Sequence, residues 1–151
     1  MKLRMKVTAF LVAALCSALA PLSAATAPRT VEITANDQMK FNVTNIDAKA
    51  GEALKVVLKN IGTLPKEAMG HNWVLLKAGT DVNAFATASM TAKDTDYIAP
   101  AQKDKVLAFI KVLGPKQTAE VTFTAPAAGK YEFICSFPGH YMLMRGTLTV
   151  K

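Results

Sequence analysis

The sequence predicts an all-β protein, an antiparallel Greek-key β-sandwich with one short helix or flap inserted into it. Two observations favour this fold class: many short segments alternate between apolar and polar residues, and turn-forming residues separate these segments at regular intervals. The length is the third observation, because 151 residues suit a single domain of this kind.

The predicted strands follow one another along most of the chain. In order, they are residues 31–34, 41–44, 54–58, 71–76, 106–112, 121–124, 131–133 and 147–150. Strict alternation with β-branched and aromatic residues, as in 121–124, indicates a half-buried strand. The segments 54–58, 71–76 and 106–112 are more continuously apolar and should be buried more deeply. Turn residues separate the strands at 50–51, 60–62, 114–115, 128–129 and 138–139.

Residues 81–93 differ from the rest because they are rich in alanine. Apolar and small residues recur there at helical spacing, namely Val82, Phe85, Ala86, Ser89 and Met90. We therefore expect a short helix or flap that packs on the sandwich, followed by an irregular loop through Asp94 and Pro100.

The N-terminus has the layout of a secretory signal peptide. Lys2, Arg4 and Lys6 precede an uncharged apolar run over residues 7–20, and small residues follow it. The run is shorter than the ~20 residues that a membrane-spanning helix needs, which argues against the alternative of a membrane anchor. We predict a signal peptide over 1–27, cleaved near Ala25 or Ala27, a sandwich domain over 28–151, and no stable membrane insertion after cleavage.

Charge limits the possible partners. The chain has 18 basic and 11 acidic residues, and the predicted signal peptide contains three of the basic ones. The mature domain is therefore moderately basic, which favours solubility and some attraction to acidic partners. Its lysines are dispersed and do not form a run interleaved with aromatic residues, so the sequence does not favour nucleic-acid binding.

The segment that begins at Cys135 brings together unusual ligand chemistry. His140 and Met144 follow Cys135 within ten residues, and His71, the other histidine of the chain, lies far upstream. Two imidazole nitrogens, one thiolate and a weak axial thioether are the ligands of trigonal mononuclear copper. A copper ion can alternate between Cu(I) and Cu(II) in such a set without large ligand movement. Met142, which lies two residues nearer to His140, competes with Met144 for the axial role.

Cysteine usage agrees with a metal site. Cys16 leaves with the predicted signal peptide, so the mature chain has Cys135 alone and can form no internal disulfide. An unpaired thiol in an oxidising compartment needs protection, which either metal coordination or simple burial would provide.

Other uses of these residues are less favoured. Cys135 and His140 could form a nucleophile–base pair, with Asn72 orienting the base. The residues around the thiol offer no clear oxyanion donors, however, and Met144 would then have no role. A structural zinc site usually needs more cysteine or histidine ligands than this chain offers.

Several motifs together resemble the azurins, which are blue copper proteins of the bacterial periplasm with the cupredoxin fold. The motifs are residues 36–41, 64–66, 69–75 and 135–149, and the resemblance extends from about Val31 to Lys151. It implies a periplasmic carrier of single electrons, not an enzyme, with one copper ion per chain cycling between Cu(I) and Cu(II).

The resemblance also implies roles for individual residues. His71, Cys135 and His140 would be equatorial ligands, with the thioether of Met144 and the carbonyl of Gly70 on the axis. Met142 would then belong to the surface. Asn72 would tie the two ligand-bearing segments together through Ser136, and Phe137 would cover the site.

An apolar patch around His140 would dock redox partners such as c-type cytochromes, a copper nitrite reductase or a terminal oxidase. The patch residues are Met39, Leu64, Met69, Pro138, Gly139, Met142 and Leu143. The chain departs from the azurins in two respects: it has no disulfide in its mature part, and Tyr141 replaces the small residue that usually follows the exposed histidine.

Overall fold

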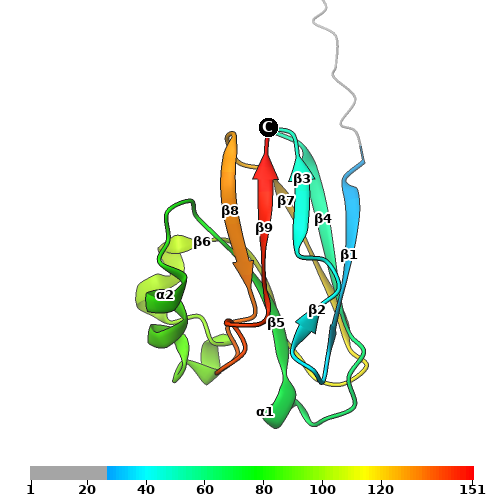
Figure 1. Cartoon of the computed structure of the whole chain (residues 1–151), viewed down its shortest axis with the longest axis vertical. Coiled ribbons are helices and arrows are strands. Elements are labelled where there is room, and N and C mark those ends of the chain that lie inside the picture. Colours follow the sequence, from blue (N-terminus) through cyan, green and yellow to red (C-terminus); the bar gives the residue numbers. More distant parts are fainter. Residues whose placement is uncertain (1–26) are drawn as a thin grey trace, which may run out of the picture.

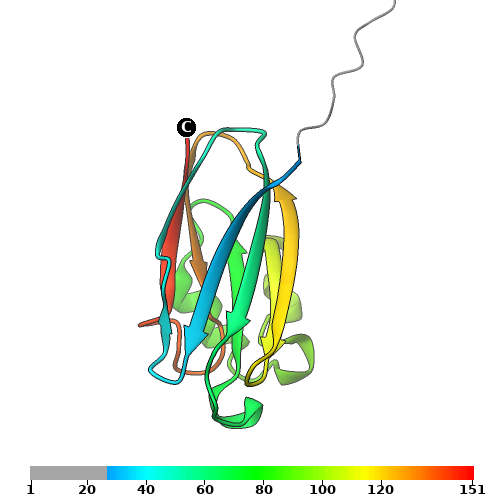
Figure 2. The same cartoon turned by 90° about the vertical axis from the view of Figure 1, so that its right-hand side faces the viewer.

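A computed structural model describes residues 27–151, so the predicted signal peptide, including Cys16, lies outside the described residues. Within this range no helix is long and apolar enough to cross a membrane. The described chain forms two β-sheets packed face to face, with a short helix beside them (Figures 1 and 2).

Each sheet contains strands from distant parts of the sequence. The four-stranded sheet has the order β2 (Lys40–Phe41), β1 (Arg29–Asn36), β4 (Ala53–Asn60) and β7 (Thr118–Thr124). The five-stranded sheet has the order β3 (Asn45–Ala48), β9 (Arg145–Val150), β8 (Gly129–Ile134), β5 (His71–Leu76) and β6 (Val106–Leu113). Figure 2 shows β1, β4 and β7 side by side in front of the second sheet.

The all-β sandwich is confirmed, but the expectation of purely antiparallel pairing is wrong. β1 pairs with β4 in parallel, and β3 pairs with β9 in parallel, while the other pairs are antiparallel. Both parallel pairs join strands that are not consecutive in the chain. Alternation within a strand indicates which side chains are buried, but it does not determine the direction of the neighbouring strand.

The predicted strand at 41–44 is wrong beyond its first residue, and β3 was not expected. The chain leaves the first sheet after Phe41 and joins the second at Asn45. Between them, the carbonyl of Thr44 already accepts a hydrogen bond from the Thr147 N–H at 2.8 Å. The alternating pattern therefore spans a crossing between sheets and does not mark one continuous strand.

The predicted helix is present as α2 (Val82–Ser89). Asp81 caps it, because its carboxylate accepts a hydrogen bond from the N–H of Ala84 at 3.0 Å. Its buried face includes Phe85 and packs against a cluster that contains Val74 of β5 and Ile134 of β8. Figure 1 shows α2 to one side of the strands, so the helix covers the outer face of the second sheet.

The segment after α2 is more ordered than expected. It contains two short 3-10 helices, η1 (Lys93–Thr95) and η2 (Pro100–Lys105), in place of an irregular loop. A further one-turn helix, α1 (Lys66–Met69), was not predicted and precedes β5 directly.

The main core fills the space between the sheets. Trp73 and Phe133 are fully buried there, with ring centroids 5.5 Å apart. All of β5 is buried, so the deep burial expected of residues 71–76 is confirmed. The same cluster of buried side chains extends to Cys135, Phe137 and Met144. The candidate site is therefore continuous with the hydrophobic core at one end of the sandwich.

Candidate metal centre

Strand pairing brings the two ligand-bearing segments together. His71 is the first residue of β5, and Cys135 follows directly after Ile134, the last residue of β8. β5 and β8 are antiparallel neighbours, so the start of one lies beside the end of the other. His140 and Met144 lie in the loop between β8 and β9, at the lower end of Figure 1.

Among residues 27–151, the histidine, cysteine and acidic side chains form one group close enough to share a metal ion: His71, Cys135 and His140. Their ligand atoms all lie within 4.8 Å of one another. The Cys135 Sγ is 3.6 Å from the His140 Nδ1, and the two imidazole centroids are 5.1 Å apart. Two ligands that bind one ion at roughly 2.0–2.3 Å are separated by about 3.5–4 Å, so the sulfur–nitrogen distance fits a shared metal.

The bonding of His71 also fits a metal. This side chain is fully buried, yet neither ring nitrogen has a hydrogen-bond partner among the described residues. Buried polar groups are almost always partnered, so an unpartnered imidazole inside the protein points to a ligand that completes its bonding. A metal ion coordinated by one of these nitrogens would do so.

The electrostatic environment keeps both imidazoles neutral. Burial lowers the pKa of His71. The nearby Asn36 carbonyl and the Asp37 carboxylate partly oppose this shift, although neither accepts a hydrogen bond from the ring. Burial also lowers the pKa of His140 to about 4, and the neighbouring His71 adds to that effect. Neutral imidazole is the form that binds metals, so both rings are ready for coordination at neutral pH.

Burial has the opposite effect on the pKa of the Cys135 thiol. Burial raises the pKa of Cys135 to about 12, and the backbone N–H groups of Asn72 and Phe137 only partly oppose this shift. The metal-free protein therefore holds a neutral thiol at pH 7. Metal binding must displace its proton, because the thiolate is the form that coordinates.

The structure separates the two methionines that compete for the axial position. Met144 is fully buried in the core cluster, whereas Met142 is 66% exposed. The Met144 carbonyl accepts a hydrogen bond from the Cys135 N–H at 2.9 Å, and the Met144 N–H donates to the His140 carbonyl at 2.8 Å. These two bonds fold the loop tightly, with Met144 on the inner side.

Gly70 occupies a position that admits no side chain. A Cβ there would lie 2.6 Å from the Lys66 carbonyl oxygen, 2.6 Å from a Val112 methyl group and 3.1 Å from the Phe137 ring. The backbone just before His71 is therefore packed against both the preceding helix and the loop that follows Cys135.

The expected tie between Asn72 and Ser136 is present and is double. The Asn72 amide nitrogen donates to the Ser136 hydroxyl oxygen at 2.8 Å, and the Ser136 N–H donates to the Asn72 amide oxygen at 2.8 Å. Asn72 also donates to the Asp96 carbonyl at 2.8 Å, and the Ser136 hydroxyl donates to the Tyr97 carbonyl at 2.7 Å. Three separate segments are thus held together beside Cys135.

Sequence reasoning missed Asp96 and Tyr97. Both adopt the left-handed backbone conformation, with φ of 54° and 56°, which turns their carbonyls toward the site. The ring of Tyr97 also packs edge-on against that of Phe137, with centroids 5.0 Å apart. The centroids of the Phe137 and His140 rings are 4.7 Å apart. Phe137 therefore covers His140 as expected, but the sequence carries no signal for the tyrosine behind it.

The predicted docking residues lie at the same end as the site. Leu64, Met142 and Leu143 are 42%, 66% and 62% exposed, while Met39 and Met69 are half-buried. The Asp37 carboxylate accepts hydrogen bonds from the N–H and the hydroxyl of Thr63, which fixes the loop that carries Leu64. The His140 side chain is itself almost buried, with 3% of its surface exposed.

A two-sheet β-sandwich with two imidazoles and one thiolate converging at its end defines a cupredoxin, the class of small copper proteins. The family model for copper-binding proteins of the plastocyanin/azurin type matches residues 28–151, and the chain belongs to this family. The protein accordingly binds one copper ion and is an electron carrier, not an enzyme.

Individual relatives agree with this assignment. Azurin of Pseudomonas aeruginosa strain PAO1 is 42% identical over 137 residues, which cover 87% of this chain and 90% of the relative. The solved structure of auracyanin A, a blue copper protein of Chloroflexus aurantiacus, is similar with a TM-score of 0.75 and 37% identity, covering 83% of this chain and all of that one. Outer membrane protein H.8 of Neisseria meningitidis is 39% identical over 121 residues, covering 78% of this chain and 65% of the relative.

Proposed function

We propose that this protein is an exported carrier that accepts and donates one electron at a time, with copper held by His71, Cys135 and His140. The observation that carries the proposal is the convergence of these three buried side chains, in which the His71 nitrogens have no other partner. Copper bound there supplies reversible one-electron chemistry between Cu(I) and Cu(II).

The role of the protein is to hold the donors still. His71 and Cys135 are anchored in paired strands, His140 lies in a loop closed by the Met144 hydrogen bonds, and Asn72 joins the segments. A donor set fixed in this way changes little between oxidation states, which favours rapid electron transfer. Phe137 and the surrounding core keep water away from the thiolate.

We assign the weak axial positions to Met144 and to the carbonyl of Gly70. Met144 is the buried methionine of the loop, and the exposure of Met142 leaves that side chain to the surface. Gly70 precedes His71 directly, and the absence of a side chain permits its close packing against Val112 and Phe137. A long axial thioether tunes the reduction potential of such sites.

We further propose that electrons enter and leave near His140. His140 lies in the loop between β8 and β9, and the exposed patch residues Met142 and Leu143 belong to the same loop. A small apolar surface suits the brief contacts of electron-transfer partners. Suitable partners are c-type cytochromes, a copper nitrite reductase or a terminal oxidase.

The proposed location is the periplasm, reached through cleavage of residues 1–27. β1 begins at the end of the sandwich opposite to the loop after β8 (Figure 1). Processing or attachment at the N-terminus therefore leaves the proposed docking patch free. The composition of that N-terminal segment supports export, and mass spectrometry of the protein from the bacterial envelope would identify the mature first residue.

Cys135→Ser tests the assignment of the thiolate. The copper-loaded wild-type protein should show an intense blue charge-transfer absorption and the narrow electron paramagnetic resonance splitting of a copper–thiolate site. The variant should remain a folded sandwich by circular dichroism but lose the blue colour. Persistence of the colour in this variant would rule out Cys135 as the ligand.

A further inference from the structure

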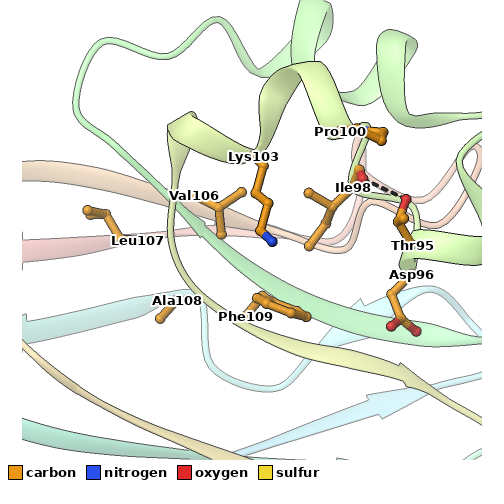
Figure 3. Close-up of a pocket in the computed structure, with 9 residues that line it drawn as sticks. All are labelled: Thr95, Asp96, Ile98, Pro100, Lys103, Val106, Leu107, Ala108 and Phe109. Carbon is orange, nitrogen blue, oxygen red and sulfur yellow. Dashed lines mark hydrogen bonds between the residues drawn. The ribbon is translucent and has the colours of Figure 1, made fainter.

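A concavity lies between η2 and β6 (Figure 3). It is a cavity of about 470 Å³, which is within the usual range for small-molecule pockets. Its walls are mainly apolar and include Ile98, Val106, Ala108 and Phe109. None of the proposed copper ligands lines it, so the following inference does not depend on the proposed function.

The wall formed by β6 is unusually apolar for a surface. Leu107 and Phe109 are 37% and 43% exposed, although both are large hydrophobic residues. β6 is the last strand of the five-stranded sheet, and the described chain pairs it only with β5. Exposed apolar side chains that line a concavity are typical of a binding site.

One charged group points into this apolar cavity. Figure 3 shows the Lys103 side chain descending from η2 with its ammonium group above Phe109. No described residue forms an ion pair with Lys103. The one acidic group in the wall, Asp96, lies at the end of the cavity, and its carboxylate already accepts a hydrogen bond from the Val112 N–H at 2.9 Å.

We propose that this cavity binds a small amphipathic anion. Its apolar body, an aromatic ring or a short alkyl chain, packs against Phe109 and Ile98, and its carboxylate or sulfonate pairs with Lys103. Apolar walls with a few placed polar groups are the usual composition of small-molecule sites, in which the polar group fixes the orientation of the ligand. The unpaired ammonium selects the sign of the charge.

A second copy of the chain fits this surface less well. Antiparallel pairing of two β6 edges with Leu107 of one copy opposite Phe109 of the other would also place Lys111 opposite Lys105, the η2 residue that directly precedes β6. Like charges directly opposite each other destabilise a strand pair, and edge lysines commonly prevent such association.

Titration of the Cu(I)-loaded protein with naphthalene sulfonate tests the proposal by nuclear magnetic resonance. The amide signals of Val106 to Phe109 should shift and saturate. Lys103→Met should weaken binding about two- to fivefold, as expected for the loss of one exposed ion pair. Phe109→Ser should weaken it about tenfold, because the ring is the main apolar contact. Lys130→Met, an exposed lysine on β8, serves as the matched control and should bind normally.

Naphthylmethylammonium supplies the decisive comparison because it has the same ring system and the opposite charge. It should bind more weakly than the sulfonate, and the difference should disappear in Lys103→Met. Equal binding of both compounds to the wild-type protein, or shifts that avoid 106–109, would refute the proposal. Sedimentation that shows a dimer dissociated by Phe109→Ser would also refute it, because a second copy would then cover the cavity.

Discussion

The amide of Asn72 should contribute strongly to the stability of the metal-free protein. Asn72→Leu keeps a similar volume but removes three hydrogen bonds, two with Ser136 and one with the Asp96 carbonyl. The Ser136 N–H is then left without a partner on a residue that is 1% exposed. An orphaned buried donor costs about 1–3 kcal/mol, and the half-buried Asp96 carbonyl adds less.

We therefore expect the variant to lose about 2–4 kcal/mol of unfolding free energy, or roughly 10 °C in Tm. Urea unfolding of the metal-free protein is the appropriate assay, because bound copper would add its own stabilisation. Asn83→Leu, at an exposed position of α2, is the matched control and should change stability by less than about 0.5 kcal/mol.

A double-mutant cycle with Ser136→Ala separates the network from simple packing. That variant keeps the Ser136 N–H but loses the hydroxyl that accepts from Asn72 and donates to Tyr97. The two losses should be coupled by at least about 0.5 kcal/mol, because the residues share a hydrogen bond. Strictly additive losses, or an Asn72→Leu variant as stable as the control, would show that the network does not hold these segments together.

Three further predictions concern the ligand segments and pH. Met144→Ala should retain copper and change its reduction potential in voltammetry, whereas Met142→Ala should leave the potential nearly unchanged; the reverse result would move the axial assignment. Gly70→Ala should cost about 1–3 kcal/mol or more in urea unfolding, because its Cβ would lie 2.6 Å from the Lys66 carbonyl, and wild-type stability would contradict the packing described. The pKa of His140 is about 4 in the folded metal-free protein, below the value of an unfolded histidine, about 6.5. The unfolded chain therefore binds more protons between these values, so the contribution of His140 should lower the stability from pH 6.5 to pH 4. The lowered pKa values of the Asp37 and Glu52 carboxyls should continue the fall at more acidic pH. A flat profile between pH 6.5 and pH 4, from unfolding at several pH values, would contradict the His140 contribution.

The strands and the metal donors could be predicted from sequence because their signals are local. The apolar run of β5 and the alternation around Tyr131 persist over several residues, and both coincide closely with observed strands. The three donors are chemically rare, since the chain has two histidines and Cys135 is the cysteine outside the predicted signal peptide. Scarcity alone required that any site with two imidazoles use His71 and His140.

The errors arise where the environment, not the local pattern, determines the structure. Residues 41–44 alternate like a strand, but the chain crosses between sheets there, and the short β3 follows with only Ile46 and Ala48 buried. The positions of Asp96 and Tyr97 beside Ser136 depend on how the segment after α2 folds back on β6. No feature of residues 94–98 alone predicts that the carbonyls of Asp96 and Tyr97 accept hydrogen bonds from Asn72 and Ser136.

The arrangement of the site explains how a metal-free chain can remain poised for copper. Burial of His71 without a hydrogen-bond partner and of a neutral Cys135 thiol is unfavourable by itself. Three sets of hydrogen bonds hold these groups in place: the β5–β8 pairing, the closure of the loop by Met144 and the network around Asn72. These constraints act through backbone groups and through the Asn72 and Ser136 side chains, not through the donor atoms of His71, Cys135 and His140. Because copper binds the folded arrangement of these donors, its coordination should add to the stability of the folded state.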